Sequence, residues 1–541
     1  MSTSVPLPDT AEEWKAPSAA PEVRMVNLFD RAYDGVVAAA RTCYSTRIIT
    51  PEQVGGDAVV DHEDRQARQE RRDRLAEEIY RAGHHTTYQH AHVQFALTNV
   101  SRQFLWSFLH AHPFYNSEQV SQRYVEVRDG NYLVPPLQGK ALEIYLRTVR
   151  MQSDAYHRLI EVLHPTAERE YLKLFPGRKK NPERVAKDVK KRAQEIARYV
   201  LPVATFAYLY HTVSVLTLFR YYRLANELDA PAEQRFVIGK MVSELLAREP
   251  DYRKILEEPI PLEETLEYQT FASLRSSLSP GANRVFREEF DQSLEGRVSK
   301  LIDWKANAVS TLASSVREVL GIPREALSDC DAVRLVLDPA RNRYLSESLV
   351  LTTIGKLTRS MHNVHYTFRK KLSHTADSQD QRHRMTPASR PVVHAYLSEE
   401  PDYVVPMLIG ENAEGGEIYA STMKETWNAI GRLRELGVDA TDVAYLLPNA
   451  VSIRFTESSD LLNLHHKHKM RLCYNAQEEI WRASLDEAIQ IRELHPEIGS
   501  YLLPPCTPRK EAKVRPYCPE GPRYCGVPVW NLDLEEYERI L

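Results

Sequence analysis

The segment GHHTTYQH, residues 83–90, is the most informative stretch of this chain, because it groups imidazole and hydroxyl side chains between two hydrophobic patterns. Before it, residues 62–82 are highly charged and carry a helical apolar stripe, and Gly83 is well placed to end that helix. After it, residues 90–95 alternate between apolar and polar side chains. This alternation predicts a strand that leads away from the histidines.

Composition and charge bound the class of protein. The chain has 541 residues, 43% of them hydrophobic and 27% charged, with a formal net charge of −4. This length predicts two or three domains, and the balance of charge argues against a broad nucleic-acid surface. The six cysteines are irregularly spaced and form no disulfide framework, so we expect a cytoplasmic protein. We find no apolar run of 18 residues or more and expect no contact with a membrane.

Two segments, one before and one within the first half, differ from the rest in composition. Residues 1–21 are rich in Pro and Ser without an apolar core, which predicts a disordered lead rather than a signal peptide. The basic stretch 179–192 has two interpretations, a nucleic-acid patch or a solvated helix face. No zinc-finger or helix-turn-helix signature accompanies it, so we expect no nucleic-acid partner.

The pattern of elements suggests a duplicated chain. We predict helices over 138–200, one long helix over 206–228, and a helix-prone connector over 285–320. The second half then repeats short pieces of the first in the same order, which predicts tandem domains over 22–300 and 301–541. The paired pieces are 23–28 with 333–338, 100–102 with 358–360, 132–135 with 403–406, and 201–202 with 447–448.

The histidines of the central segment leave more than one interpretation open. His84, His85, His90 and His92 fall within nine residues, and neutral imidazole is a common metal ligand. However, no Asp, Glu or Cys lies in this window to complete a familiar metal-binding spacing. Hydrogen-bonded structural histidines are the simpler interpretation, and we predict no metal site here.

Three further motifs carry polar chemistry. SQRY at 121–124 places a hydroxyl and a guanidinium on one face of an extended segment, as an anion site needs. EIAR at 195–198 precedes Leu-Pro, and RLCYNAQEEI occupies 471–480. Together with AARTCYS at 39–45 and the segment at 83–90, they resemble the flavin-dependent thymidylate synthases. The resemblance covers most of the chain to residue 240, and then strongly only residues 440–482.

The resemblance implies a fold and an activity. It implies an α+β protein of two thymidylate-synthase-like domains, each with mixed helices and an antiparallel sheet. It implies reductive methylation of dUMP to dTMP, with FAD as cofactor, methylenetetrahydrofolate as carbon donor and NADPH as reductant. In such a reaction the protein binds and orients, while the cofactor carries the hydride chemistry.

The same resemblance implies roles for individual residues. The catalytic residues are expected to be His84, Arg123 and Arg471. The residues expected to bind the flavin are His84, Thr86, His90, His110, His466, Gln477 and Glu479. The residues expected to bind the nucleotide are Glu118, Gln119, Ser121, Arg123, Arg198 and Arg471.

The sequence also departs from the family's pattern. Where the family has Arg-His-Arg, the first half has Leu109-His110-Ala111. The second half has RKK at 369–371 near the expected position, followed by RHR at 382–384. The segment HHKHK at 465–469 has an alternative interpretation as a solvated basic face. Losing an arginine that faces an anion should cost on the order of 1.5–3 kcal/mol per charged hydrogen bond.

Because each half keeps different motif residues, we expect a composite site between unlike halves. The family assembles its sites across subunits of a tetramer, so a homodimer of this chain would form a pseudo-tetramer. The alternative is an inactive duplicated homologue that serves as a nucleotide-binding protein or scaffold.

The Pro-rich tail contains half of the cysteines, Cys506, Cys518 and Cys525. Three thiolates with a fourth ligand, such as a His or Cys473, could hold zinc. The spacings fit no standard knuckle, so buried or free thiols remain the alternative.

Overall fold

The computed structural model of the chain describes residues 14–56, 61–227, 229–275, 278 and 281–541. Its fold is α+β, with two four-stranded antiparallel sheets ordered β1-β2-β4-β3 and β5-β6-β8-β7. The strands are β1 (Glu22–Leu28), β2 (His92–Ser101), β3 (Asn116–Gln119), β4 (Phe206–Ser214), β5 (Ser299–Trp304), β6 (His365–Ser373), β7 (Ala388–Ser389) and β8 (Ser452–Asp460).

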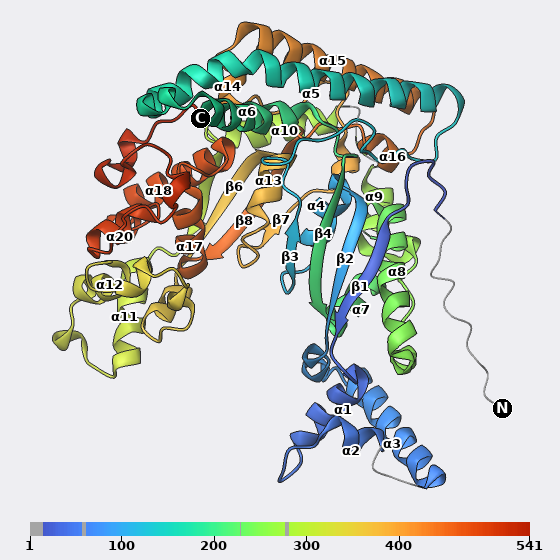
Figure 1. Cartoon of the computed structure of the whole chain (residues 1–541). Coiled ribbons are helices and arrows are strands. Elements are labelled where there is room, and N and C mark those ends of the chain that lie inside the picture. Colours follow the sequence, from blue (N-terminus) through green and yellow to red (C-terminus); the bar gives the residue numbers. More distant parts are fainter. Residues whose placement is uncertain (1–13, 57–60, 228, 276–277, 279–280) are drawn as a thin grey trace.

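Helices form the larger part of both halves (Figure 1). The helices are α1 (Ala32–Thr42), α2 (Pro51–Gly55), α3 (His62–Arg81), α4 (Arg102–His110), α5 (Gly139–Leu174), α6 (Pro182–Ala197), α7 (Val215–Arg223), α8 (Pro231–Arg248), α9 (Leu266–Arg275), α10 (Ala282–Ser293), α11 (Ala308–Leu320), α12 (Asp329–Leu337), α13 (His374–Asp380), α14 (Met407–Gly410), α15 (Ala413–Glu435), α16 (Ala440–Ala444), α17 (Leu461–Arg471), α18 (Glu478–Leu494), α19 (Pro496–Gly499) and α20 (Cys506–Glu511).

The two halves have the same topology, which confirms the predicted α+β duplication. In each sheet the second strand runs directly into a helix whose first turn is capped by a serine, Ser101 before α4 and Ser373 before α13. The fourth strand in chain order of each sheet also runs directly into a capped helix, with Ser214 before α7 and Asp460 before α17. Each side chain accepts a hydrogen bond from a backbone N–H that the helix leaves unpaired.

The structure confirms some predicted elements and corrects others. Helix α3 spans the charged stretch, and α5 and α6 fill the region predicted to be helical. The single helix predicted over 206–228 is wrong: β4 ends at Ser214 and α7 follows. Exposed Tyr208 and Tyr210 alternate with buried neighbours along β4. The sequence does not reveal this two-residue alternation of a strand, because tyrosine is compatible with a core and with a surface.

The paired sequence pieces were half right. Tyr132 bridges Thr205 in the first half and Tyr403 bridges Val451 in the second, as the repeat predicts. Residues 333–338, however, lie mostly in α12, and the true counterpart of β1 is β5, inside the predicted helical connector. The counterpart of residues 100–102 is 372–374 and not 358–360, because strand pairing rather than a three-residue similarity sets the alignment.

The predicted domain limits lie after residues 21 and 300. Residues 1–13 lie outside the described residues, and within the rest of the predicted disordered lead Trp14 packs 5.0 Å from the ring of Phe236. The order of residues 14–21 follows from burying this indole. The predicted boundary after residue 300 falls inside β5, so the division of the chain at this point stays a prediction.

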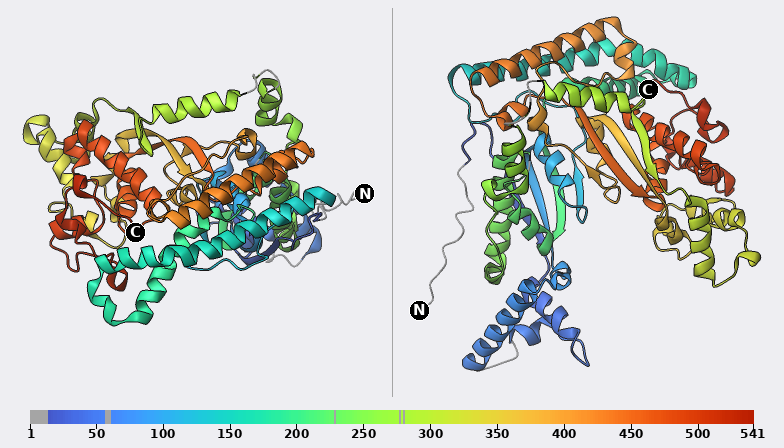
Figure 2. Two further views of the ribbon diagram at one scale, coloured as in Figure 1. Left: turned by 90° about the horizontal axis from the view of Figure 1, so that it is seen from above. Right: turned by 180° about the vertical axis from the view of Figure 1, so that it is seen from behind.

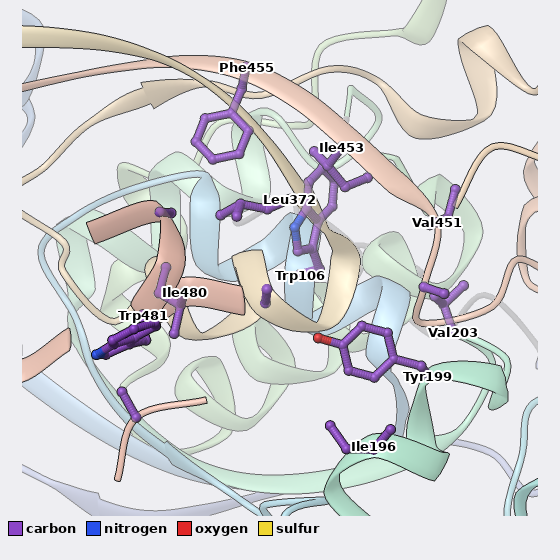
Figure 3. Packing of buried hydrophobic residues seen from close by; sticks show 14 of the residues in the cluster. Trp106, Ile196, Tyr199, Val203, Leu372, Val451, Ile453, Phe455, Ile480 and Trp481 are labelled. Carbon is purple, nitrogen blue, oxygen red and sulfur yellow. The ribbon is translucent and has the colours of Figure 1, made fainter. Parts of the chain in front are cut away.

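The halves are joined along a seam with approximate two-fold symmetry. Val203 N–H donates to the Leu447 carbonyl and Asn449 N–H donates to the Leu201 carbonyl, each at 2.8 Å. The two long helices α5 and α15 run side by side across both halves in the views of Figures 1 and 2. One hydrophobic core therefore contains side chains from both halves, including Trp106, Tyr199, Ile453 and Trp481 (Figure 3).

Buried carboxylates cross the same seam. Glu233 accepts hydrogen bonds from Ser101 and from the hydroxyl of Tyr445 in the other half, at 2.8 Å. Glu479 mirrors it, accepting from Ser373 and, at 2.7 Å, from Tyr199. These pairs fix the relative position of the halves.

Burial raises the pKa of Glu233 from 4.5 to about 7, despite the hydrogen bonds from Ser101 and Tyr445 that oppose the shift. Between these values the folded chain binds more protons than the unfolded chain, so stability is lost as pH rises. Relative to Glu233→Gln, the wild-type free energy of unfolding should fall by up to about 3 kcal/mol through this window. Urea titrations at several pH values measure this, and equal slopes in both proteins would contradict it.

A lobe made of α1, α2, α3 and the 3-10 helix η1 (His85–His90) stands below the first sheet in Figure 1. Tyr88 anchors it, with its hydroxyl donating to the Ala76 carbonyl at 2.6 Å. In the part of the chain that the structure describes, every helix is too short or too polar to cross a lipid bilayer.

Candidate functional site

A cavity of about 650 Å³ lies between the two halves and is rich in arginine. The first half contributes β3, the loop after it and the ends of α4 and α6. The second half contributes α13, the loop after it and one face of α17. The lining residues are Arg102, Glu118, Gln119, Val120, Ser121, Gln122, Arg123, Tyr124, Arg198, Thr375, Ser378, Gln379, Arg382, His383, Arg384, Met385, Thr386, Asn449, Asn463, His466, Met470 and Arg471.

Arg102 shapes the first wall. It follows the cap residue of α4, and its guanidinium donates to the Gln119 side chain at 2.9 Å and to the Val120 carbonyl at 2.7 Å. The loop after β3 is therefore held at the point where SQRY begins. Burial, followed by the charge of Arg198, lowers the pKa of Arg102 to about 9.

Two more arginines belong to the same wall, Arg123 within this loop and Arg198 after α6. Arg123 forms an ion pair with Glu195 at 2.8 Å and donates to the Asn475 carbonyl of the second half at 2.8 Å. Arg198 is almost fully buried, and burial lowers its pKa. Among the residues that the structure describes, its Nε and Nη2 have no hydrogen-bond partner. Buried donors without partners are costly, so this arginine is suited to an anionic ligand.

The second wall is the face of α17 that carries Asn463, His466, Met470 and Arg471. These positions follow the three- and four-residue spacing of one helical face. Arg471 donates from Nε to His383 Nε2 at 2.8 Å and from Nη2 to the Gln379 carbonyl at 2.7 Å. Its head group is thus held at the cavity wall by α13 and the loop that follows.

Electrostatics in the cavity favour a bound anion. Burial lowers the pKa of Arg471 to about 10, and the charges of Arg123 and Arg382 add to this effect. Burial also lowers the pKa values of His383 and His466, with contributions from nearby cations, so both imidazoles are neutral at pH 7. An anion placed among these guanidinium groups would offset their mutual repulsion.

A buried ionic cluster lies directly behind α13 and α17. Lys370 Nζ lies 2.7 Å from Glu457 and from Glu487, and 3.3 Å from Asp380. Lys467 Nζ lies 2.9 Å from Asp380 and also pairs with Glu457. All five side chains are fully buried. The interpretation of residues 465–469 as a solvated face is therefore wrong for Lys467, since the carboxylates replace its lost hydration.

The structure brings many of the predicted site residues to this cavity. It does not bring the others there. His84, Thr86 and His90 are exposed on the lobe, which supplies none of the lining residues. The predicted site residues in the cavity lining are Glu118, Gln119, Ser121, Arg123, Arg198, His466 and Arg471.

Three predicted flavin residues have structural partners instead. Gln477 caps α18 and donates to the Tyr199 hydroxyl, and Glu479 accepts from Ser373 and Tyr199. His110 packs edge-on against Trp106, and burial places its pKa well below the usual range. These side chains join the two halves behind the cavity.

The most important cavity residues that were not predicted to be site residues are Arg382, His383 and Arg384. All three line the cavity, and Arg382 also pairs with Glu118 of the first half at 2.7 Å. They spell the Arg-His-Arg sequence that the first half lacks, and this literal match was the available signal. Residues 369–371, predicted near that position, lie in β6, where Lys370 belongs to the buried cluster.

The position related to this cavity by the approximate symmetry is filled by side chains. Asp377 accepts from the indole N–H of Trp106 at 2.7 Å and forms an ion pair with Arg390 at 2.8 Å. Where the cavity has Arg102 and Arg471, the counterpart positions have His374 and Ala225, both buried. The cavity is therefore a feature of one side of the pseudo-dimer.

Comparisons with known proteins find the same family in both halves of the chain. The family model described as thymidylate synthase complementing protein matches residues 24–251 and 331–497. The flavin-dependent thymidylate synthase of Clostridium tetani is 27% identical over 222 residues, which is 40% of this chain and 80% of that protein. That of Saccharolobus solfataricus is 27% identical over 143 residues, which is 26% of this chain and 55% of that protein. That of Thermococcus onnurineus is 32% identical over 149 residues, which is 26% of this chain and 56% of that protein.

Proposed function

Because the chain belongs to the family of thymidylate synthase complementing proteins, we propose that it catalyses the reductive methylation of dUMP to dTMP. Methylenetetrahydrofolate would donate the carbon and NADPH the reducing equivalents. The observation that supports this most is the convergence of arginines from both halves on one cavity. These are Arg102, Arg123, Arg198, Arg382, Arg384 and Arg471.

The cavity residues divide into two groups by position. Ser121, Arg123 and Arg198 lie on the first-half wall, where hydroxyl and guanidinium donors suit a nucleotide phosphate. Arg471 and His466 lie opposite on α17. We assign dUMP to the first wall, with Arg471 reaching it from the second. Glu118 and Gln119 would contact the nucleotide from the end of β3.

The donor set also fits FAD, which carries a pyrophosphate. Arg382 and Arg384 supply two cations on the loop after α13, and His466 supplies a neutral ring next to them. The unpaired buried donors of Arg198 show that the polar groups of the cavity exceed what the chain itself satisfies. When bound, the flavin would supply the hydride chemistry, while these residues hold and orient its phosphates and the nucleotide.

We propose that the exposed segment at 83–90 contributes to the cavity of a second chain. Its histidines lie on the lobe and face solvent, so within one chain they do not complete the cavity. In a homodimer, the lobe of the partner would supply His84, Thr86 and His90 to the cavity. Two chains would then form a pseudo-tetramer with one site per chain.

Binding of dUMP should depend on arginines from both halves. Arg123→Ala and Arg471→Ala each remove charged hydrogen bonds of about 1.5–3 kcal/mol, so each should raise the Kd for dUMP about 10- to 150-fold. Isothermal titration calorimetry on FAD-saturated protein measures this. Arg220→Ala, on the related helix α7 of the first half, is the matched control and should bind normally.

The outcomes separate the composite site from its alternatives. If dUMP binding survives both Arg123→Ala and Arg471→Ala, the composite site is wrong. If all proteins bind dUMP but tritium release from [5-³H]dUMP is absent with FAD, NADPH and methylenetetrahydrofolate, the chain is a nucleotide-binding protein and not a synthase.

A further inference from the structure

A group of cysteine thiols lies where the C-terminal tail meets the loop between α17 and α18. It shares no residue with the arginine cavity. Four of the six cysteines line one small enclosed space of about 10 Å³. Cys473 comes from the loop between α17 and α18. Cys506 begins α20, and Cys518 and Cys525 come from the irregular segment that follows.

These thiols differ from the two remaining cysteines. Cys43 and Cys330 are exposed, whereas Cys506 is buried and the other three are half-buried. All six are free thiols. Four thiols from three separate segments therefore converge in a space with little solvent.

We propose that Cys473, Cys506, Cys518 and Cys525 together bind one structural Zn²⁺ ion. Four thiolates are a complete tetrahedral ligand set for zinc, with Zn–S distances of about 2.3 Å. The enclosed space is near the size of one ion or water molecule, which suits a closed structural site. This proposal is independent of the proposed synthase activity.

The tail has a physical need for such a cross-link. Beyond α18 its helices are short, with four residues in α19 and six in α20. Segments with so little regular secondary structure are commonly stabilised by a metal or by disulfides. Polar contacts also hold it to the domain, among them the Asn475 amide donating to the Arg523 carbonyl at 2.6 Å and the Arg492 guanidinium donating to Asp533 at 2.8 Å.

The thiols must reorient to bind the ion. Among the described residues, no three such side chains are already arranged as metal ligands. Cys525 Sγ instead donates to the Val527 carbonyl at 3.5 Å. A change of one χ1 rotamer moves a cysteine sulfur by roughly 3 Å, which is enough to turn it from that carbonyl into the enclosed space.

Burial also shifts pKa values in this group of thiols. Burial raises the pKa of Cys473 to about 11 and that of Cys506 to about 12, and the neighbouring thiols raise them further. Zinc binding would displace the thiol protons, and the ion would balance two of the four thiolate charges.

The site would also support the cavity wall. Cys473 is two residues from Asn475, whose carbonyl accepts from Arg123. The Ala476 carbonyl next to it accepts from Arg539 of the tail at 2.8 Å. A zinc ion on Cys473 would therefore fix the loop that positions Arg123.

Metal analysis of the full-length protein tests the proposal. Protein purified under reducing conditions without chelator should contain one zinc per chain by plasma mass spectrometry. Cys518→Ser should lose that zinc, whereas Cys43→Ser and Cys330→Ser, which change the two exposed thiols, should keep it. Because Cys518→Ser could fail to fold, wild-type protein reconstituted with Co²⁺ gives a second readout, the absorption bands of a tetrahedral tetrathiolate.

Thiol counting in denaturant distinguishes the contrary outcomes. Six reactive thiols in protein that binds neither Zn²⁺ nor Co²⁺ would mean four ordinary buried cysteines. Two reactive thiols before reduction and six after it would mean two disulfides. Either result overturns the zinc site.

Discussion

Replacing Lys467 with methionine should lower the free energy of unfolding by about 3–5 kcal/mol. The ammonium group lies 2.9 Å from Asp380 and also pairs with Glu457, and all three side chains are fully buried. Methionine keeps the aliphatic stem but leaves two buried carboxylates short of a cation. Equilibrium urea unfolding of wild type and variant, followed by tryptophan fluorescence, measures the difference.

The first half provides the matched control at the related position. Tyr221 occupies the same place relative to the cap of α7 as Lys467 does relative to the cap of α17. It lies among Phe108 and His211, and its hydroxyl has no hydrogen-bond partner among the described residues. Tyr221→Phe should therefore change stability by less than about 1 kcal/mol. If Lys467→Met lowers the free energy of unfolding no more than Tyr221→Phe does, the buried ionic cluster does not stabilise the fold.

The contrast between these positions shows why the core of the second half could not be predicted. The strand pairs Phe95–His211 and Phe368–Glu457 occupy the same register in the two sheets, yet one half is aromatic and the other ionic. Lys370 and Lys467 meet their carboxylates from separate elements. A segment such as HHKHK looks solvated because its partners lie elsewhere in the chain.

The cavity was more predictable than the core around it. SQRY and the residues around Arg471 were recognisable because each motif keeps its ligand-facing side chains in a short segment. These two motifs lie in different halves and come together at the seam because the chain is duplicated. The Leu-Pro sequences at 201–202 and 447–448 had indicated this duplication. Arg382, His383 and Arg384 were not predicted to be site residues because residues 369–371 stand nearer the position that the family motif implies, whereas in the structure those residues lie in β6.

The division of the proposed site between two chains predicts recovery of activity on mixing. A cavity-deficient chain, Arg123→Ala with Arg471→Ala, loses two sets of charged hydrogen bonds, so its kcat/KM should fall at least about 100-fold. A lobe-deficient chain, His84→Ala with Thr86→Ala, keeps an intact cavity. In a mixed dimer, one cavity is intact and faces an intact lobe, while the other combines both defects. Random mixing should therefore restore about a quarter of the wild-type rate, and the mixed dimer isolated from the other dimers about half of it.

Co-expression with two affinity tags gives the mixed dimer, and tritium release from [5-³H]dUMP gives the rate. The control mixes Arg123→Ala with Arg471→Ala chains. Both arginines belong to the same cavity, so neither chain offers an intact one and no recovery is expected. If the lobe-deficient mixture gives only the mean of its two parents, His84 and Thr86 do not act on the cavity of the partner. The lobe would then have to serve its own chain or no site at all, because its histidines lie outside the cavity lining within one chain.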